Sequence, residues 1–286
     1  MIDAHMHYWD LNRLDVGWVR PDLGNVYRNF LPEDLAPLIK NVGVSKTIVV
    51  EAASTKEETE FLLQLYEKHD IVAGVVGGLS LDSATFRQDL SAFRQRPGLV
   101  GVRFRSGWKQ REWETNPQLK SNLKWIENEG FPVDVTFGFH EVYAMIALME
   151  AFPDLKVAID PAGNPAALQS PDTLASWREQ MRKVSSNKSV VCKIKLFGLM
   201  DIARPDNRVN TAWNADHLVP FVHEIIDLFG TSSTIFGTNW PVSLVYGDYE
   251  EAVKLMQRCI PPHITEEEKK AIFGLNAETF YDLPRR

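Results

Sequence analysis

Two histidines near the beginning of the chain, His5 and His7, have the residue type and spacing to act on one molecule. They follow a short apolar run, Met1-Ile2-Asp3-Ala4, that is typical of a β-strand. Side chains on a strand alternate between its two faces, so positions i and i+2 point the same way and their imidazoles can converge. Such a pair could bind a divalent metal or an anionic substrate. Near the other end of the chain, a second strand-like run at residues 235–237 leads to the polar side chain of Asn239.

Polar residues also stand at or just after the ends of the other apolar segments. They are Glu51, Ser80 and Asp82, Arg103 and Arg105, Asp134, Thr136 and His140, Asp160, and Lys193 and Lys195. A buried charge is costly unless it is paired, so charged groups at the ends of otherwise apolar strands are hard to explain as core. The pattern favours a wet, functional cavity.

The elements that must position these residues alternate regularly. Predicted strands cover residues 2–5, 46–51, 72–77, 99–104, 132–136, 156–160, 189–194 and 234–237. Predicted helices cover residues 32–42, 56–69, 83–94, 117–128, 141–151, 173–185 and 216–229. Strands that are apolar throughout are typical of parallel strands buried on both faces. Eight strand–helix repeats predict an α/β protein with a (β/α)8 TIM barrel, and a doubly wound open sheet is the alternative.

Bulk composition narrows the function further. A chain of 286 residues with 44% hydrophobic residues fits one globular domain, residues 1–286. The net charge of -7 argues against nucleic-acid and anionic-membrane partners. We expect a cytoplasmic monomer or homodimer with a small-molecule substrate, because no membrane span or secretory signal is evident and the two cysteines, Cys192 and Cys259, look like buried thiols.

Three motifs resemble those of a known family. The opening His5-Met6-His7-Tyr8-Trp9-Asp10 is similar to His-x-His-x-Trp-Asp, Gly237-Thr238-Asn239-Trp240-Pro241-Val242 to Gly-Ser-Asp-Trp-Pro-Val, and Asn276-Ala277-Glu278-Thr279-Phe280-Tyr281 to Asn-Ala-x-x-x-Tyr. Over nearly its whole length the chain resembles the amidohydrolase superfamily, in the branch that holds sugar-lactone hydrolases and pyrone-dicarboxylate lactonase. The resemblance implies a barrel of the amidohydrolase type that hydrolyses a lactone. It also implies a general-base Asp after strand eight and histidines after strands one and six, with or without a divalent metal.

Two departures from the family pattern fall on the chemistry. The histidine slot after strand six holds Pro161, and the Asp slot after strand eight holds Asn239. Proline has no donor or ligand atom in its side chain, and an amide does not take up a proton near neutral pH. Three explanations stay open: an exchange designed to trap a substrate, a move to metal-free chemistry with another proton carrier, or a protein that binds a ligand without turnover.

From these observations we expect a metal-independent hydrolase of the lactonase type, acting on a sugar-derived or carboxylated small molecule. The alternatives are a lyase or isomerase reaction in the same pocket and a catalytically silent binder. Expected catalytic residues are His5, His7, Asn239 and His140. Expected substrate-binding residues are Arg103, Arg105, Glu51, Lys193, Trp9, Asp160 and Trp240, with substrate or Glu51 as the partner of Lys193. No cofactor is expected, although His5 and His7 could hold a divalent metal weakly.

Overall fold

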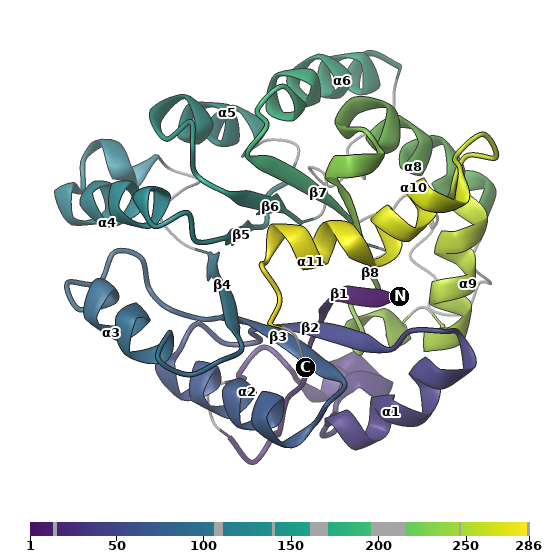
Figure 1. The fold of residues 1–286 in the computed structure, drawn as a ribbon, viewed down its shortest axis with the longest axis horizontal. Helices are drawn as coiled ribbons and strands as arrows, with labels where there is room; N and C mark the ends of the chain where they lie inside the picture. Colours follow the sequence, from purple (N-terminus) through teal and green to yellow (C-terminus); the bar gives the residue numbers. More distant parts are fainter. Residues whose placement is uncertain are drawn as a thin grey trace.

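In the computed structural model of the chain, the described residues are 1–13, 16–105, 111–138, 141–160, 171–195, 215–245 and 247–284. Within them eight strands form one sheet in sequential order (Figure 1). They are β1 (Ile2–Met6), β2 (Lys46–Val50), β3 (Val72–Gly77), β4 (Leu99–Phe104), β5 (Val133–Val135), β6 (Val157–Ile159), β7 (Val190–Lys195) and β8 (Thr234–Gly237). Each strand pairs in parallel with the next, which confirms the predicted (β/α)8 barrel.

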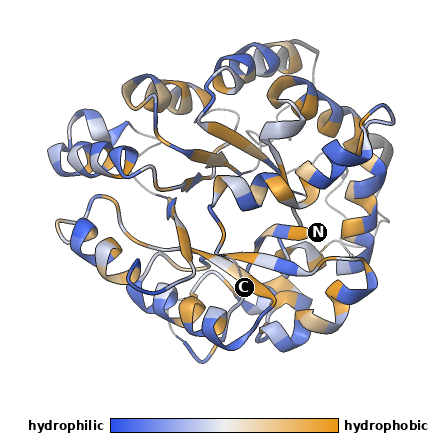
Figure 2. Ribbon diagram, in the orientation of Figure 1, coloured by the Kyte–Doolittle hydropathy of each residue, from blue (hydrophilic) through white to orange (hydrophobic). Residues whose placement is uncertain are grey.

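Helices surround the strands on the outside of the barrel (Figure 1). They are α1 (Pro32–Asn41), α2 (Lys56–Lys68), α3 (Phe86–Phe93), α4 (Pro117–Asn128), α5 (Val142–Ala151), α6 (Pro171–Ser185), α8 (Ala215–Phe229) and α9 (Tyr249–Cys259). After them come α10 (Glu266–Lys270), a π-helical turn (Ala271–Leu275) and α11 (Asn276–Phe280). In Figure 2 most of the outer helices carry both hydrophobic and hydrophilic residues, as is typical of helices that pack one face on a core.

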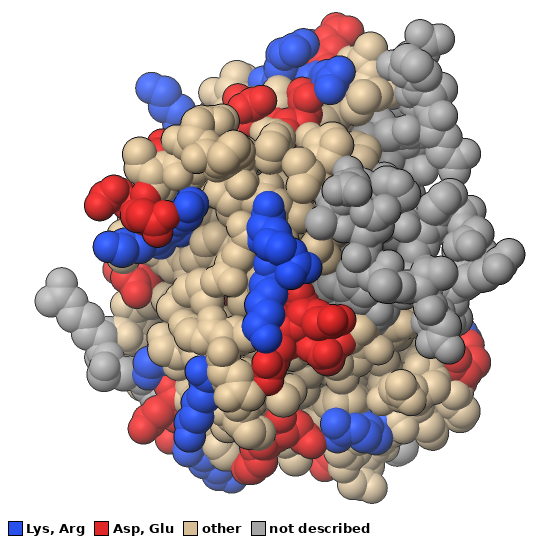
Figure 3. Space-filling model, turned by 90° about the vertical axis from the view of Figure 1, so that its right-hand side faces the viewer, with Lys and Arg blue, Asp and Glu red and all other residues tan. Residues whose placement is uncertain are grey.

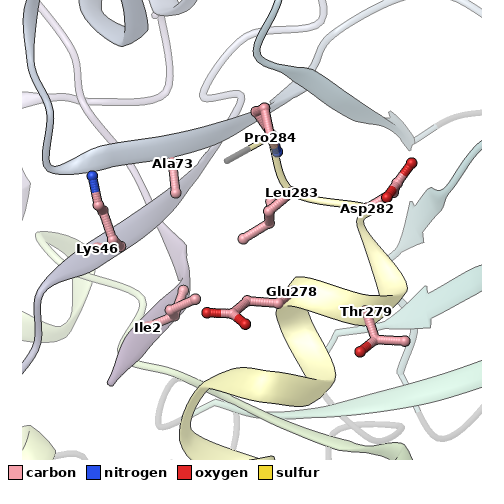
Figure 4. Close-up of a pocket in the computed structure, with 8 residues that line it drawn as sticks. All are labelled: Ile2, Lys46, Ala73, Glu278, Thr279, Asp282, Leu283 and Pro284. Carbon is pink, nitrogen blue, oxygen red and sulfur yellow. The ribbon is translucent and has the colours of Figure 1, made fainter. Parts of the chain in front are cut away.

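The barrel interior has an apolar layer that reaches α11 at the end where the strands begin. Its members include Ile2, Ala4, Ile48, Val50, Val76, Val100, Ala158, Val191, Ile235, Ala277 and Tyr281. In Figure 1 the view is onto this end, and α11 lies across it. A surface cavity between β1, β2 and the C-terminal segment lies at the same end (Figure 4). The interior is therefore plugged by apolar side chains at one end, and its buried polar residues gather toward the other.

The surface is charged, and both thiols are buried. On the face drawn in Figure 3, acidic and basic side chains are interspersed. Some of the charged surface residues form ion pairs, for example Lys254–Glu250 and Lys269–Glu266. Among the described residues no helix is both long and apolar enough to span a membrane. Cys192 and Cys259 are buried free thiols, as predicted.

Candidate active site

The first strand changes the face that it presents to the barrel interior between Ala4 and Met6. Ile2 and Ala4 pack in the interior layer, whereas Met6 packs between the strands and the helices. Strict alternation would put all three on one side, but the pairing of β1 with β2 shifts between Asp3 and Met6. A bulge of this kind adds one residue and re-aims the side chains beyond it, which is common beside active sites. His5 contacts interior side chains of β7 and of the end of β6, and His5 and His7 are both buried.

Residues after β8 join the last strand to the first. The Asn239 amide N–H donates to the His5 carbonyl at 2.8 Å, and the His7 amide N–H donates to the Trp240 carbonyl at 2.7 Å. Two residues before His5 on β1, the Asp3 carboxylate accepts from the Thr238 amide at 2.9 Å and from the Thr238 hydroxyl at 2.5 Å. These contacts form the seam of the barrel, and they hold the strand-eight motif directly over β1.

Two backbone features of this seam depend on residue type. A Cβ at Gly237 would lie 2.8 Å from the Cβ of His5, so only glycine leaves room for the histidine. Asn239 has a φ of 61°, in the left-handed region that asparagine tolerates better than most residues.

His7 is fixed in one tautomer by a backbone carbonyl. Its Nδ1 lies 2.8 Å from the Val50 carbonyl, which can only accept, so Nδ1 carries the proton and Nε2 keeps a lone pair. That Nε2 faces the Asn239 side-chain amide, with 3.3 Å between Nε2 and Oδ1. Burial, assisted by the charges of Arg103 and Lys195, lowers the pKa of His7 to about 3. The ring is therefore neutral near physiological pH.

His5, Asp160 and Lys195 form a closed ring of contacts. His5 Nδ1 lies 3.0 Å from Asp160 Oδ2, Lys195 Nζ lies 2.7 Å from Asp160 Oδ1, and Lys195 Nζ lies 3.3 Å from His5 Nε2. Burial opposes ionisation of Asp160, but the charges of Lys195 and Arg103 outweigh it and lower its pKa. Burial lowers the pKa of Lys195 to about 8. Burial and the positive charge of Lys195 together lower the pKa of His5 well below its ordinary value. The ring thus combines a carboxylate, a neutral imidazole and an ammonium.

The two arginines of the fourth strand connect this ring to Glu51. Arg103 donates from Nη2 to Thr136 Oγ1 at 2.6 Å, and the same nitrogen lies 3.4 Å from Asp160 Oδ2. Its Nη1 lies 3.9 Å from Glu51 Oε1, the oxygen that also accepts from Arg105 Nε. Arg103 is 9% exposed and Arg105 40% exposed, so Arg105 stands at the outer edge of the cluster.

Lys193 differs from its predicted role. The sequence suggests that Lys193 pairs with substrate or Glu51, but Lys193 Nζ lies 2.6 Å from Asp134 Oδ2. The other oxygen of Asp134 accepts from the Tyr281 hydroxyl at 2.6 Å. Because Tyr281 belongs to the apolar layer at the opposite end, this trio sits deeper in the barrel and is fully buried. Lys193 is therefore an interior charge that is paired with Asp134. Lys195, two residues further along β7, lies at the mouth of the barrel, where it contacts Asp160.

Trp9 and Trp240 are also placed differently from the prediction that they contact substrate. Both are buried in the core, at 0% and 1% exposure. Trp9 donates to the Arg28 carbonyl at 2.8 Å, and both rings stack edge-on against Phe30. Both indole rings are therefore part of the hydrophobic core. The neighbouring Trp18 is 38% exposed and donates to the Ala52 carbonyl at 2.7 Å, so it is the better aromatic candidate for a substrate wall.

The structure brings together most of the residues predicted for the site. His5, His7, Asn239, Arg103, Arg105, Glu51 and Asp160 are linked through the contacts given above. His140 and Pro161 lie outside the described residues. Lys195 and Thr136 matter more than the sequence suggests. The signal for Lys195 was its spacing of two from Lys193 on one strand, which cannot tell the deeper position from the outer one.

A (β/α)8 barrel that gathers imidazole, guanidinium, ammonium and carboxylate groups at the carboxyl ends of its strands has the arrangement of a barrel enzyme. The chain matches the amidohydrolase family over residues 2–283, and it belongs to that family.

Relatives cover the whole chain. An L-fucono-1,5-lactonase from Burkholderia ambifaria is 29% identical over 99% of this chain and 96% of its own length. A second L-fucono-1,5-lactonase, from Burkholderia multivorans, is 27% identical over 99% of this chain and 96% of its own length. A crystal structure of an amidohydrolase from Burkholderia multivorans with bound HEPES has a TM-score of 0.88 and 26% identity, covering 99% of each chain. A second crystal form of that amidohydrolase contains bound zinc.

The described residues of this chain do not by themselves form a metal site. No group of three or more His, Cys, Asp or Glu side chains converges among them in a way that could hold an ion. His5 Nε2 faces the Lys195 ammonium at 3.3 Å, and His7 Nε2 faces an amide. A catalytic zinc usually has three protein ligands, and a divalent cation at His5 would be repelled by the ammonium. The described residues therefore do not fit a resident divalent metal.

Proposed function

We propose that this chain hydrolyses the ring ester of a sugar-derived lactone with its own side chains and no resident metal. The observation that carries the proposal is the full-length similarity to two L-fucono-1,5-lactonases. The cluster at the barrel mouth supplies the groups that this chemistry needs. The substrate class is an aldonolactone, a cyclic ester that carries several hydroxyl groups.

Opening a lactone makes three demands on the site. Water must be deprotonated as it adds to the carbonyl carbon, the carbonyl oxygen must be stabilised while it is negative, and the ring oxygen must be protonated as it leaves. A preorganised positive charge in a buried site is especially effective for the second demand, because no solvent has to reorient.

Lys195 and Arg103 meet the demand for positive charge. Both groups lie within 3.4 Å of an Asp160 oxygen, and both side chains are largely buried. The carboxylate holds the ammonium and the guanidinium at fixed positions, so their remaining N–H groups can face the carbonyl oxygen of a bound lactone. Arg105, at the outer edge, is suited to the hydroxyl groups of the sugar chain.

His7 and Asn239 orient the attacking water in this proposal. The lone pair on His7 Nε2 accepts from the NH2 group of Asn239, which leaves the Asn239 carbonyl oxygen to accept a hydrogen bond from the water. Neither group has to change its charge, which agrees with the low pKa of His7. His5 holds the Lys195 ammonium through its Nε2, at 3.3 Å.

Metal independence is part of the proposal and is supported by the position of Lys195. Its ammonium brings positive charge to His5 Nε2, where a metal ion could otherwise bind. We also propose a cytoplasmic location, supported by two buried free thiols, because such thiols suit a reducing compartment.

The test is hydrolysis of a panel of five- and six-membered aldonolactones that includes L-fucono-1,5-lactone. Acid release is followed with a pH indicator, the hydroxy-acid product is identified by NMR, and the metal content of the pure protein is measured. We expect turnover that survives a chelator and a loss of about 100-fold or more in kcat/KM for His5→Ala, because that variant no longer holds the Lys195 ammonium in place. His263→Ala, at an exposed histidine, serves as the matched control.

Three outcomes separate the alternatives. No turnover of any lactone, combined with a ligand-dependent rise in melting temperature, would identify a silent binder. A product other than the ring-opened acid would identify a lyase or isomerase. Activity that is lost with chelator and restored by zinc would overturn metal independence alone.

A further inference from the structure

Glu51 is a carboxylate at the barrel mouth with one oxygen that lacks a hydrogen bond among the described residues. The residue follows β2 directly and is fully buried. Oε1 accepts from Arg105 Nε, while Oε2 is buried and has no hydrogen-bond partner. A buried acceptor without a partner is costly, so an oxygen kept in this state points to a molecule that binds there.

The other interior carboxylates are already engaged. Both oxygens of Asp134 accept hydrogen bonds, from Lys193 and Tyr281, deep in the barrel. Asp160 Oδ1 has no hydrogen bond either, but it lies 2.7 Å from the Lys195 ammonium, and Oδ2 lies 3.0 Å from His5 Nδ1. Of these three carboxylates, only Glu51 combines a position at the mouth with an oxygen that has neither a hydrogen bond nor an ion pair among the described residues.

Glu51 is also placed next to the other groups of the site. Its chain neighbour Val50 provides the carbonyl that fixes His7. On its other side, the Ala52 carbonyl accepts from the half-exposed Trp18 at 2.7 Å. A molecule that rests on Trp18 and faces His7 would therefore lie beside Glu51.

We propose that Glu51 is the proton carrier of the hydrolysis, held in position by Arg105. This inference rests on the proposed lactonase function. The ionised Glu51 takes a proton from water as the water oxygen bonds to the lactone carbonyl carbon and the carbonyl electron pair moves to oxygen. When the tetrahedral intermediate collapses, the bond from carbon to the ring oxygen breaks, and the proton moves from Glu51 to that oxygen. One lactone and one water give one hydroxy acid, and Glu51 returns to its ionised form.

The groups around Glu51 shift its pKa in the direction that suits a general base. Burial raises its pKa, and the positive charges of Arg103 and Arg105 on the β4 side oppose that shift without cancelling it. Asp134 on β5 adds to the rise. From α2, Glu58 binds the Ala52 amide at 2.9 Å and pairs with Arg13, so it is engaged elsewhere. A raised pKa brings the carboxylate closer to the operating pH, where a general base is most effective.

The experiment compares Glu51→Gln with the wild type on a lactone that the wild type hydrolyses. We expect kcat to fall about 100-fold to 10,000-fold, the range typical of a lost general base, with KM changed much less. We also expect the acidic limb of the wild-type kcat/KM profile, which lies above the ordinary glutamate pKa, to disappear. Glu127→Gln is the matched control, because Glu127 is a buried glutamate on the outer helix α4.

Two further variants keep the inference falsifiable. Glu51→Asp retains a carboxylate and should keep measurable activity with a shifted acidic limb, which also covers the case in which Glu51→Gln does not fold. Arg105→Met removes only the partner of Glu51 and should keep the acidic limb of the profile, shifted to higher pH, because Arg105 lowers the pKa of Glu51. If Glu51→Gln retains near wild-type kcat, or if its acidic limb is unchanged, Glu51 is not the proton carrier although the protein is a lactonase. If the wild type opens no lactone, the proposed function fails first and the role of Glu51 fails with it.

Discussion

His7 Nε2 and Asn239 Oδ1 lie 3.3 Å apart across the seam of the barrel, although the two residues are 232 positions apart in the chain. Because the Nδ1 proton of His7 is committed to the Val50 carbonyl, Nε2 offers a lone pair to its neighbour. An amide can turn its NH2 group toward that lone pair, whereas an ionised carboxylate cannot donate. The Asn239 side chain can therefore donate a hydrogen bond to a neutral His7. This gives a structural reason why the chain has Asn239 at the position where the family pattern has Asp.

Replacing Asn239 with aspartate tests this match. We expect Asn239→Asp to raise the pKa of His7 from about 3, because the new negative charge favours the protonated ring. We expect kcat/KM to stay level or fall, since the added charge opposes the negative transition state. NMR titration of the His7 ring and lactone kinetics measure the two effects. A gain of about 100-fold or more would instead mean that an Asp-dependent site had been disabled by Asn239 and would count against Glu51 as base.

Lys195 should limit activity on the alkaline side. Its pKa is lowered to about 8, mainly by burial, so the ammonium is lost as the pH rises through that value. We expect kcat/KM to decline above pH of about 8 once spontaneous lactone hydrolysis is subtracted. Lys195→Arg keeps its charge over this range and should lose the decline, whereas Lys195→Met should be about 100-fold slower at every pH. An unchanged alkaline decline in Lys195→Arg would exclude Lys195 as its source.

Gly237 should be intolerant of a side chain. The Cβ of Gly237→Ala would lie 2.8 Å from the His5 Cβ and 3.1 Å from its backbone nitrogen, so β1 must shift. We expect a loss of about 1–3 kcal/mol in the free energy of unfolding, as for other overpacked sites, together with reduced kcat. Urea denaturation measures the first effect. Gly17→Ala is the control, because no described atom lies within 4 Å of its added Cβ. Equal stabilities of the two variants would contradict the steric account.

Asp3 should make stability fall as the pH rises through the mildly acidic range. Burial raises its pKa from 3.8 to about 6 despite the hydrogen bonds from Thr238 and Tyr249. The folded state then binds more protons than the unfolded state between these values, so the stabilising contribution is complete below pH 3.8 and is lost above about 6. The shift corresponds to about 3 kcal/mol. Urea unfolding of wild type and Asp3→Asn from pH 4 to 7 should show their difference changing by that order, and parallel curves would contradict it.

The fold and much of the site could be predicted from the sequence because both depend on periodicity. Apolar runs separated by helical segments identify the strands, and the carboxyl ends of parallel strands meet at one mouth. The convergence of His5 and His7 followed from their spacing, although the bulge that turns both inward did not, because a bulge depends on pairing with β2. That β8 lies beside β1 followed from the barrel itself.

The depth of each side chain could not be read from the chain alone. Lys193 and Lys195 share a strand face, and only the contact of Lys193 with Asp134, itself bonded to Tyr281, assigns Lys193 to the deeper layer. The burial of Trp9 likewise depends on Phe30, which lies on a neighbouring segment. In each case the deciding partner is remote in sequence, and its position depends on the completed fold.

The seam between the first and the last strand has a consequence for how the protein is made. The hydrogen bonds of His5 and His7 to residues 239 and 240 cannot form until most of the chain has left the ribosome. During synthesis, β1 and its two histidines lack contact with β8 until the intervening segments have emerged from the ribosome. A truncated chain that ends before β8 would therefore lack the framework of the pocket as well as one wall of it. Competence for ligand binding should appear only at the end of translation, in a single late step.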